Sequence, residues 1–145
     1  MHIENDKAYE LAQCMSKLFC LMKPKKFIND IKPSQMMVMV SIAHINIAKG
    51  YATPSMISDE LGLSKSALTA ILNTLEEKKL IQQSLSNEDR RMLLLSITSE
   101  AEKLLDVYHD NIQSSLLNLT TYLGEEDTEK LIYLIKKANN FFTKD

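Results

Sequence analysis

One short stretch of this sequence, residues 53–78, constrains the fold more than any other. Two amphipathic segments follow one another there, and the linker between them contains Gly62, which ends the first helix, and Ser64, which caps the second. Thr53 caps the first helix, and Pro54 takes its first position, where proline is tolerated. Two short helices joined by such a tight glycine turn predict a helix-turn-helix.

A β-hairpin is predicted directly after these two helices. Residues 80–85 and 92–97 are apolar segments with residues that favour strands, and the turn between them is polar. We expect a β structure of two to three strands here. A hairpin that follows a helix-turn-helix forms a wing, so the region as a whole predicts a winged helix-turn-helix.

The rest of the chain is predicted to be helical. Glycine and proline number only 3 each in 145 residues, which disfavours long loops and an all-β fold. Ser99 and Glu102 have the spacing of a capping box, and Gly124 interrupts the apolar pattern that follows them. Apolar residues three and four positions apart predict outer helices over about 5–22, 33–48, 99–123 and 125–143.

The charge of the chain is unevenly distributed. The formal net charge is -2, but residues 92–145 hold nine acidic side chains against five lysines, whereas residues 63–91 hold five basic and four acidic ones. The region of the helices and hairpin can therefore face phosphate groups if the C-terminal third points elsewhere. Because no apolar run reaches the length of a membrane span and the first residues lack a signal pattern, we expect a cytoplasmic protein without membrane contact.

The second helix of the predicted helix-turn-helix has one apolar and one polar face. The polar face carries short side chains and no acidic residue before Glu76. A helix that enters the major groove of DNA, about 12 Å wide, needs such a face. The candidate DNA-binding residues on this helix and at its start are Ser64, Lys65, Ser66, Thr69 and Asn73.

The polar turn of the hairpin presents Arg90 and Arg91. A guanidinium at the tip of a wing can enter the minor groove beside the groove that the helix occupies. Asp89 is a poor phosphate ligand, and we expect it to orient an arginine through a charge-assisted hydrogen bond. The alternative interpretation is a winged-helix protein that works as a protein-interaction module and does not bind DNA.

Four segments, in this order, resemble the MarR family of transcription regulators. They are residues 57–69, residues 75–81, the turn Asn87-Glu88-Asp89-Arg90-Arg91 and residues 96–98, and the resemblance extends over about 31–105. It implies a homodimer that binds a pseudo-palindromic site in double-stranded DNA, with two winged domains in successive major grooves. The family's recognition helix corresponds to residues 64–75, and its wing-tip arginine corresponds to Arg91.

The resemblance also implies a division of the chain. We expect an N-terminal dimerisation helix and linker over 1–32, a winged helix-turn-helix DNA-binding domain over 33–98, and C-terminal dimerisation helices over 99–145. The fold class is thus mainly α with a two- to three-stranded β wing, as a winged helix-turn-helix plus a helical dimerisation region.

Two positions depart from the family pattern. Ala70 stands where the family usually has an arginine after the threonine of the recognition helix, so the preferred DNA site should differ. Lys79 stands where a glycine is common, which predicts a left-handed backbone at a lysine.

The function implied by the resemblance is a repressor that a small effector releases from DNA. In this family a crevice between the dimerisation helices and the winged domain often takes apolar or aromatic compounds. The alternative for His44 is a hydrogen-bonded core histidine, and for the methionines it is filling of the core. The candidate residues for such a pocket are Met15, Phe19, Met36, Met39, His44 and Tyr108.

Cys14 loosely resembles the N-terminal cysteine through which some members of the family sense oxidants, so an oxidant-sensing regulator is a further alternative. The sequence leaves open whether Cys14 or Cys20 is redox-active. It contains no glycine-rich phosphate loop, no nucleophile elbow, and no spacing of His, Cys and carboxylate residues that predicts a metal site. We therefore expect no catalytic activity, no cofactor and no metal.

Overall fold

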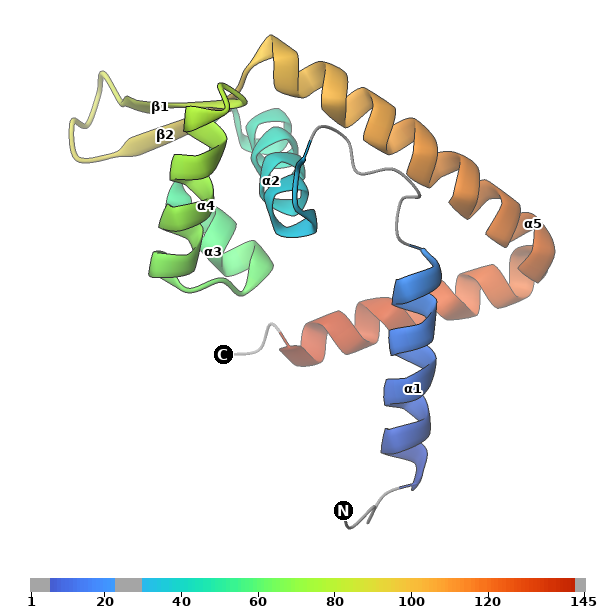
Figure 1. The fold of residues 1–145 in the computed structure, drawn as a ribbon. Coiled ribbons are helices and arrows are strands. Elements are labelled where there is room, and N and C mark those ends of the chain that lie inside the picture. The colour runs from blue at the N-terminus through green and yellow to red at the C-terminus, as the bar shows by residue number, and fades with distance from the viewer. Residues whose placement is uncertain (1–5, 23–29, 143–145) are drawn as a thin grey trace.

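The predicted fold class, mainly α with a small β wing, is confirmed by the computed structural model, which describes residues 6–22 and 30–142 (Figure 1). The helix-turn-helix and the wing form one body, and the long C-terminal helix extends from it. The elements are α1 (Asp6–Leu21), α2 (Pro33–Lys49), α3 (Pro54–Leu61), α4 (Lys65–Glu77), β1 (Ile81–Leu85), β2 (Leu93–Ile97) and α5 (Ser99–Phe142).

The hydrophobic core lies where α2, α3 and α4 meet the base of the hairpin. Helix α2 crosses its centre, and its side chains Val38, Met39 and Ile42 are fully buried. Burying such a side chain stabilises the fold by about 1.5–3 kcal/mol. The other large, fully buried side chains come from α3, α4, β1 and β2, and they are Ile57, Leu68, Leu75, Ile81 and Leu95.

The turn between α3 and α4 has the geometry that the sequence predicted. Gly62 has φ 63° and ψ 29°, a left-handed conformation that glycine adopts without strain. The Ser64 hydroxyl accepts a hydrogen bond from the Ala67 N–H at 3.2 Å, and the Thr53 hydroxyl caps α3 in the same way through the Met56 N–H. These local signals set the start of both helices, and thereby the direction in which α4 leaves the core.

The wing is a two-stranded antiparallel sheet with one additional bridge. Ile81 pairs with Ile97 at its base, and Leu85 pairs with Leu93 toward its tip. The Leu95 N–H donates to the Ala52 carbonyl at 2.9 Å, so the segment between α2 and α3 supplies a single third-strand contact. The Asn46 amide of α2 donates to the Leu95 carbonyl at 3.0 Å and fixes the wing to the core.

The predicted capping box at the start of α5 is wrong by one residue. Thr98, not Ser99, caps this helix, and its hydroxyl accepts from the Ala101 N–H at 3.3 Å. The same hydroxyl lies 2.9 Å from the Lys79 carbonyl and 3.1 Å from the Leu80 carbonyl. Strand β2 ends at Ile97, so Thr98 is the first residue free to adopt the capping role, and it joins the base of the wing to α5.

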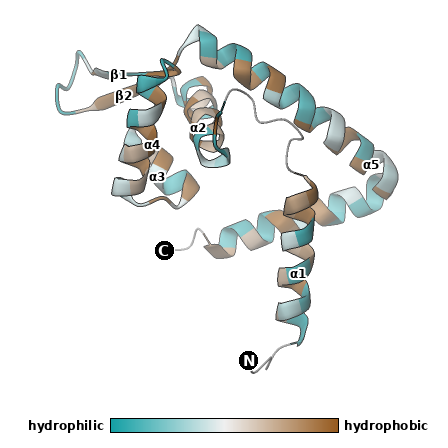
Figure 2. Ribbon diagram, in the orientation of Figure 1, coloured by the Kyte–Doolittle hydropathy of each residue, from teal (hydrophilic) through white to brown (hydrophobic). Residues whose placement is uncertain are grey.

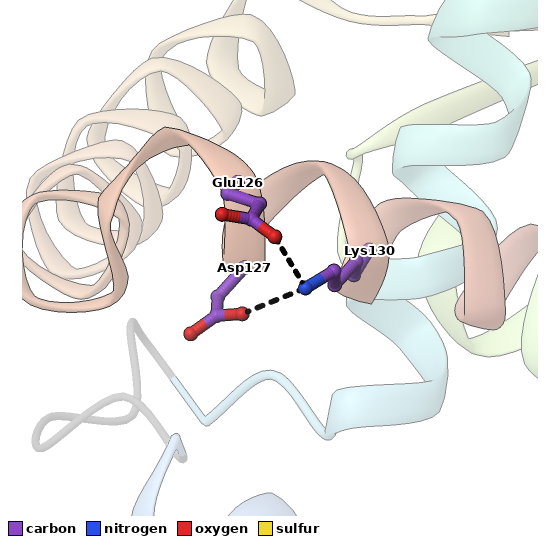
Figure 3. Close-up of polar contacts among 3 residues, drawn as sticks. All are labelled: Glu126, Asp127 and Lys130. Atoms are coloured by element: carbon purple, nitrogen blue, oxygen red, sulfur yellow. Dashed lines mark hydrogen bonds and ion pairs between the residues drawn. The ribbon is translucent and has the colours of Figure 1, made fainter.

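Helix α5 bends sharply at Gly124, where the sequence predicted a break between two helices (Figure 1). Gly124 has φ 76° and ψ 172°, a conformation that is essentially restricted to glycine. Beyond it, Lys130 forms ion pairs with Glu126 at 2.7 Å and Asp127 at 3.7 Å (Figure 3). These charged residues lie on the far part of α5, well away from the wing in Figure 1.

Helix α1 and the part of α5 beyond Gly124 contribute nothing to the core. No residue of either segment is buried, although both carry apolar side chains along their length (Figure 2). In α1 the exposed apolar side chains include Leu11, Met15, Leu18 and Phe19. Among the helices of residues 6–22 and 30–142, none is long and apolar enough to cross a membrane.

Lys79 has the left-handed backbone that the sequence predicted, with φ 59°. A side chain bearing a Cβ is strained there, and glycine is not. We therefore expect Lys79→Gly to raise the free energy of unfolding by about 0.5–1 kcal/mol in urea titrations followed by circular dichroism. Lys79→Ala keeps the strain and removes the same charge, so it serves as the control. An equal gain in both variants would assign the effect to charge and contradict the prediction.

Candidate nucleic-acid interface

Helix α4 presents a polar surface that is free of bulky or acidic side chains over its first two turns. Leu68, Leu72 and Leu75 anchor its inner face in the core, as the sequence predicted. The outer face exposes Lys65, Ser66, Thr69, Ala70 and Asn73.

The hydroxyl groups on this surface have defined orientations. Thr69 donates its hydroxyl hydrogen to the Lys65 carbonyl at 2.8 Å, and Thr74 donates to the Ala70 carbonyl at 3.0 Å. Because those hydrogens are used within the helix, each hydroxyl keeps its lone pairs available as acceptors. Asn73 adds an exposed amide that can both donate and accept. Side chains of this kind can contact phosphates or base edges.

The tip of the wing is shaped by a small set of hydrogen bonds. The Ser86 N–H donates to the Met92 carbonyl at 2.9 Å, and the Ser86 hydroxyl accepts from the Glu88 and Asp89 N–H groups at 3.2 and 3.4 Å. Asp89 Oδ1 accepts from the main-chain N–H of Arg91 at 2.9 Å. The carboxylate thus holds Arg91 through a charge-assisted hydrogen bond, and the bonded group is the main-chain N–H of the arginine.

A contact that the sequence analysis missed links the wing to α4. One carboxylate oxygen of Glu76 accepts from the Gln83 N–H at 3.2 Å, and the other accepts from the Gln83 side-chain amide at 3.0 Å. This two-point contact fixes strand β1 relative to the C-terminal end of α4. No pattern in the sequence indicates it, because it depends on how the strand turns back after the helix.

The electrostatics of this side favour an anionic partner. Arg90 and Arg91 at the wing, with Lys65 at the start of α4, are all exposed. Together with the polar face of α4 they border one surface, on which the hairpin and α4 extend in different directions from the place where they meet (Figure 1). Such a surface can follow a major groove and the adjoining minor groove of a duplex.

A second feature is a cavity of about 140 Å³ between the helix-turn-helix and α5. It contains two of the predicted pocket residues, His44 and Tyr108. His44 is exposed and stacks on His109 with ring centroids 6.0 Å apart, so it is not a core histidine. The residues that line the cavity are Met37, Val40, Ser41, His44, Glu60, Leu61 and Tyr108.

The other predicted pocket residues lie elsewhere. Met36 and Met39 point into the hydrophobic core, at 6% and 0% exposure, and Met15 and Phe19 are exposed on α1. On α2, the sequence analysis included His44 among the candidates but not Met37 and Ser41, which line the same cavity. The missing signal is the direction in which α5 crosses α2.

Cys14 and Cys20 are exposed free thiols on α1. Within the described ranges 6–22 and 30–142, no three His, Cys, Asp or Glu side chains gather where they could hold a metal ion.

The fold and this surface define a winged helix-turn-helix DNA-binding protein. The sequence model of the MarR family matches residues 29–92. The regulator ZitR from Lactococcus lactis subsp. cremoris is 29% identical over 101 residues, which cover 68% of each protein. Over these residues the chain is similar to the MarR family of transcriptional regulators.

Two solved structures are similar to this chain. A mutant MarR from E. coli in complex with operator DNA has a TM-score of 0.62 and 26% identity, with 75% of this chain and 76% of that chain covered. The regulator PcaV from Streptomyces coelicolor, solved in complex with its natural ligand, has a TM-score of 0.73 over 97% of this chain and 96% of that one. At 15% identity, the second likeness shows the fold alone.

The contact of Asp89 with the Arg91 backbone leads to a discriminating prediction. Asp89→Ala should weaken binding to operator DNA by about 1 kcal/mol, because the turn loses one hydrogen bond that orders it. Asp89→Asn keeps the accepting oxygen and should bind at least as well as the wild type. Fluorescence anisotropy at fixed salt measures both affinities. If Asp89 acted instead through an ion pair with a guanidinium, the two variants would be weakened equally.

Proposed function

We propose that this chain is a dimeric transcriptional repressor that binds a pseudo-palindromic operator. In this proposal α4 lies in the major groove, with Ser64, Lys65, Ser66, Thr69 and Asn73 toward the DNA. Arg90 and Arg91 of the wing reach the neighbouring minor groove. The observation that carries the proposal is the single surface formed by the polar face of α4 and the wing, braced against each other through Glu76. The MarR–operator complex, which shares the fold at 26% identity, supports it.

The dimer is supported by the helices that have no core of their own. An isolated helix as short as α1, at 16 residues, is only marginally stable in water, so it needs a partner surface. Its exposed apolar stripe, Leu11, Met15, Leu18 and Met22, follows one face of the helix. Beyond Gly124, α5 exposes further large apolar side chains. These two faces are the surfaces that a second copy of the chain would cover, and they fit the proposed division into dimerisation segments (1–32 and 99–145) around a DNA-binding domain (33–98).

In the proposed regulation, a small molecule releases the protein from its operator. The cavity beside α5 lies where the helix-turn-helix meets the dimerisation segment, so a bound ligand would change the spacing of the two α4 helices. Successive major grooves are about 34 Å apart, and a few ångströms of displacement would prevent simultaneous contact. PcaV, which shares the fold, was solved with its natural ligand bound. The proposal includes action in the cytoplasm, where bacterial operators are, and no catalytic activity.

The decisive experiment for DNA binding is a titration of the DNA upstream of the chain's own gene at several salt concentrations. Affinity should fall steeply and linearly with the logarithm of salt concentration, since the contacts release counterions from phosphates. Arg91→Ala should weaken binding by roughly 1–3 kcal/mol. Lys130→Ala removes one positive charge from the far part of α5 and should leave the affinity unchanged. Absence of a mobility shift at low salt would favour a protein-interaction module instead.

The dimer interface gives a separate prediction. Leu18→Glu places a charge on the apolar stripe of α1 and should convert the dimer to a monomer in sedimentation equilibrium, with loss of operator binding. Gln13→Glu adds the same charge on the opposite face of the helix, where Gln13 is exposed, and should remain dimeric. A Leu18→Glu protein that stays dimeric would remove α1 from the interface.

A further inference from the structure

One side of the cavity beside α5 is polar. The Ser41 side chain, in a residue only 3% exposed, donates its hydroxyl hydrogen to a carboxylate oxygen of Glu60. Ser41 belongs to α2 and Glu60 to α3, and their hydrogen bond holds the carboxylate of Glu60, an exposed residue, at one side of the cavity. Since the serine hydrogen is already used, this wall presents acceptor oxygens to anything that enters.

Besides the imidazole of His44, the only ionisable group among the described lining residues that carries a full charge at neutral pH is the Glu60 carboxylate. Glu60 contributes a carboxylate, and no lysine or arginine is among the residues that line the cavity. Among the described residues, the ion pairs join Lys130 to Glu126 and Asp127 on the far part of α5, and none neutralises Glu60. An anionic ligand would meet the carboxylate without a compensating cation, whereas an ammonium group would form a charge-assisted hydrogen bond with it.

The remaining walls fit a compact apolar group. Met37, Val40 and Leu61 are apolar, and Tyr108 of α5 adds an aromatic ring that attracts cations as well as hydrocarbon. The cavity volume of about 140 Å³ is close to that of an engineered protein cavity that admits benzene, about 150 Å³. One six-membered ring with a short substituent is therefore the size of ligand that the cavity holds in one subunit.

We propose that this cavity binds small organic cations, as a single ring with a protonated amine that pairs with Glu60 while the ring packs among Met37, Leu61 and Tyr108. The inference deepens the proposed function, because it names the class of compound that acts at the proposed effector site. It depends on that function only for the consequence of binding. The binding itself depends on the cavity alone.

The test compares three ligands of the same size and different charge: benzylamine, benzyl alcohol and benzoate. Their dissociation constants are measured by calorimetry on the full-length protein without DNA, at pH 8, above the range in which free imidazole titrates. Benzylamine should bind at least about tenfold more tightly than benzoate, with benzyl alcohol between them. Benzoate binding as tightly as benzylamine, or no binding of benzylamine at millimolar concentration, would overturn the proposal.

A pair of variants assigns the preference to Glu60. Glu60→Gln keeps the acceptor for Ser41 and removes the charge, so the preference for benzylamine over benzyl alcohol should vanish. Asp59→Asn makes the same change of charge at the neighbouring exposed position of α3, outside the cavity lining, and should keep the preference. A preference that persists in Glu60→Gln, or disappears equally in both variants, would contradict the assignment.

The proposed ligand class and the proposed effector function can be disproved independently of each other. Operator binding is measured on the same protein with and without benzylamine. If Glu60-dependent binding of benzylamine is found and operator affinity does not change, the ligand class is correct and the effector part of the proposed function is wrong. If operator affinity is salt-dependent and benzoate is preferred, the DNA-binding function holds and the ligand class is wrong.

Discussion

Leu95 of strand β2 connects the wing to the hydrophobic core and to α2. Its side chain is 1% exposed in the core, its N–H bonds Ala52, its carbonyl accepts from Asn46, and it pairs with Gln83 across the hairpin. A two-stranded hairpin is marginally stable in water by itself. Because Leu95 binds the hairpin to α2 and to the segment after it, the base of the wing is fixed to the core.

From that anchor the structure extends in two directions. Toward the DNA-binding side, the Glu76–Gln83 contact sets the wing against α4, and the Asp89 turn sets Arg91 at its tip. Toward the other side, the Thr98 hydroxyl caps α5 and contacts the carbonyls that precede β1. The base of the wing and the start of the long helix are thus one hydrogen-bonded unit. In the proposed function, this unit would connect a displacement of α5 to the wing.

How much of this was predictable from the sequence depends on the range of the interaction. Local signals were sufficient for the elements: Gly62, Ser64 and Thr53 fixed the helix-turn-helix, and the left-handed Lys79 followed from family resemblance. The Thr98 cap was missed because strand length decides which residue leaves the sheet. Contacts between elements were missed too, since neither the Glu76–Gln83 brace nor the Ser41–Glu60 pair has a sequence spacing that identifies it.

The residues that line the cavity were also only partly predictable from the sequence. Of its expected members on α2, His44 lines the cavity, whereas Met36 and Met39 face the core and the unpredicted Met37 lines the cavity instead. A helix as apolar as α2 gives no clear periodic signal for which side meets which neighbour. The positions of Met15 and Phe19 are a separate matter, because in the proposed dimer a second subunit would supply the surface against which they pack.

The bend at Gly124 has a consequence for how such regulators diverge. The direction of the last helical segment is set there by one backbone conformation that only glycine readily adopts, far along the chain from α4. If that segment forms part of the subunit contact, the angle between two DNA-reading surfaces is encoded partly at this corner. The angle between the two DNA-binding surfaces can then change through substitutions at residues that do not contact DNA, while the sequence of the recognition helix stays the same.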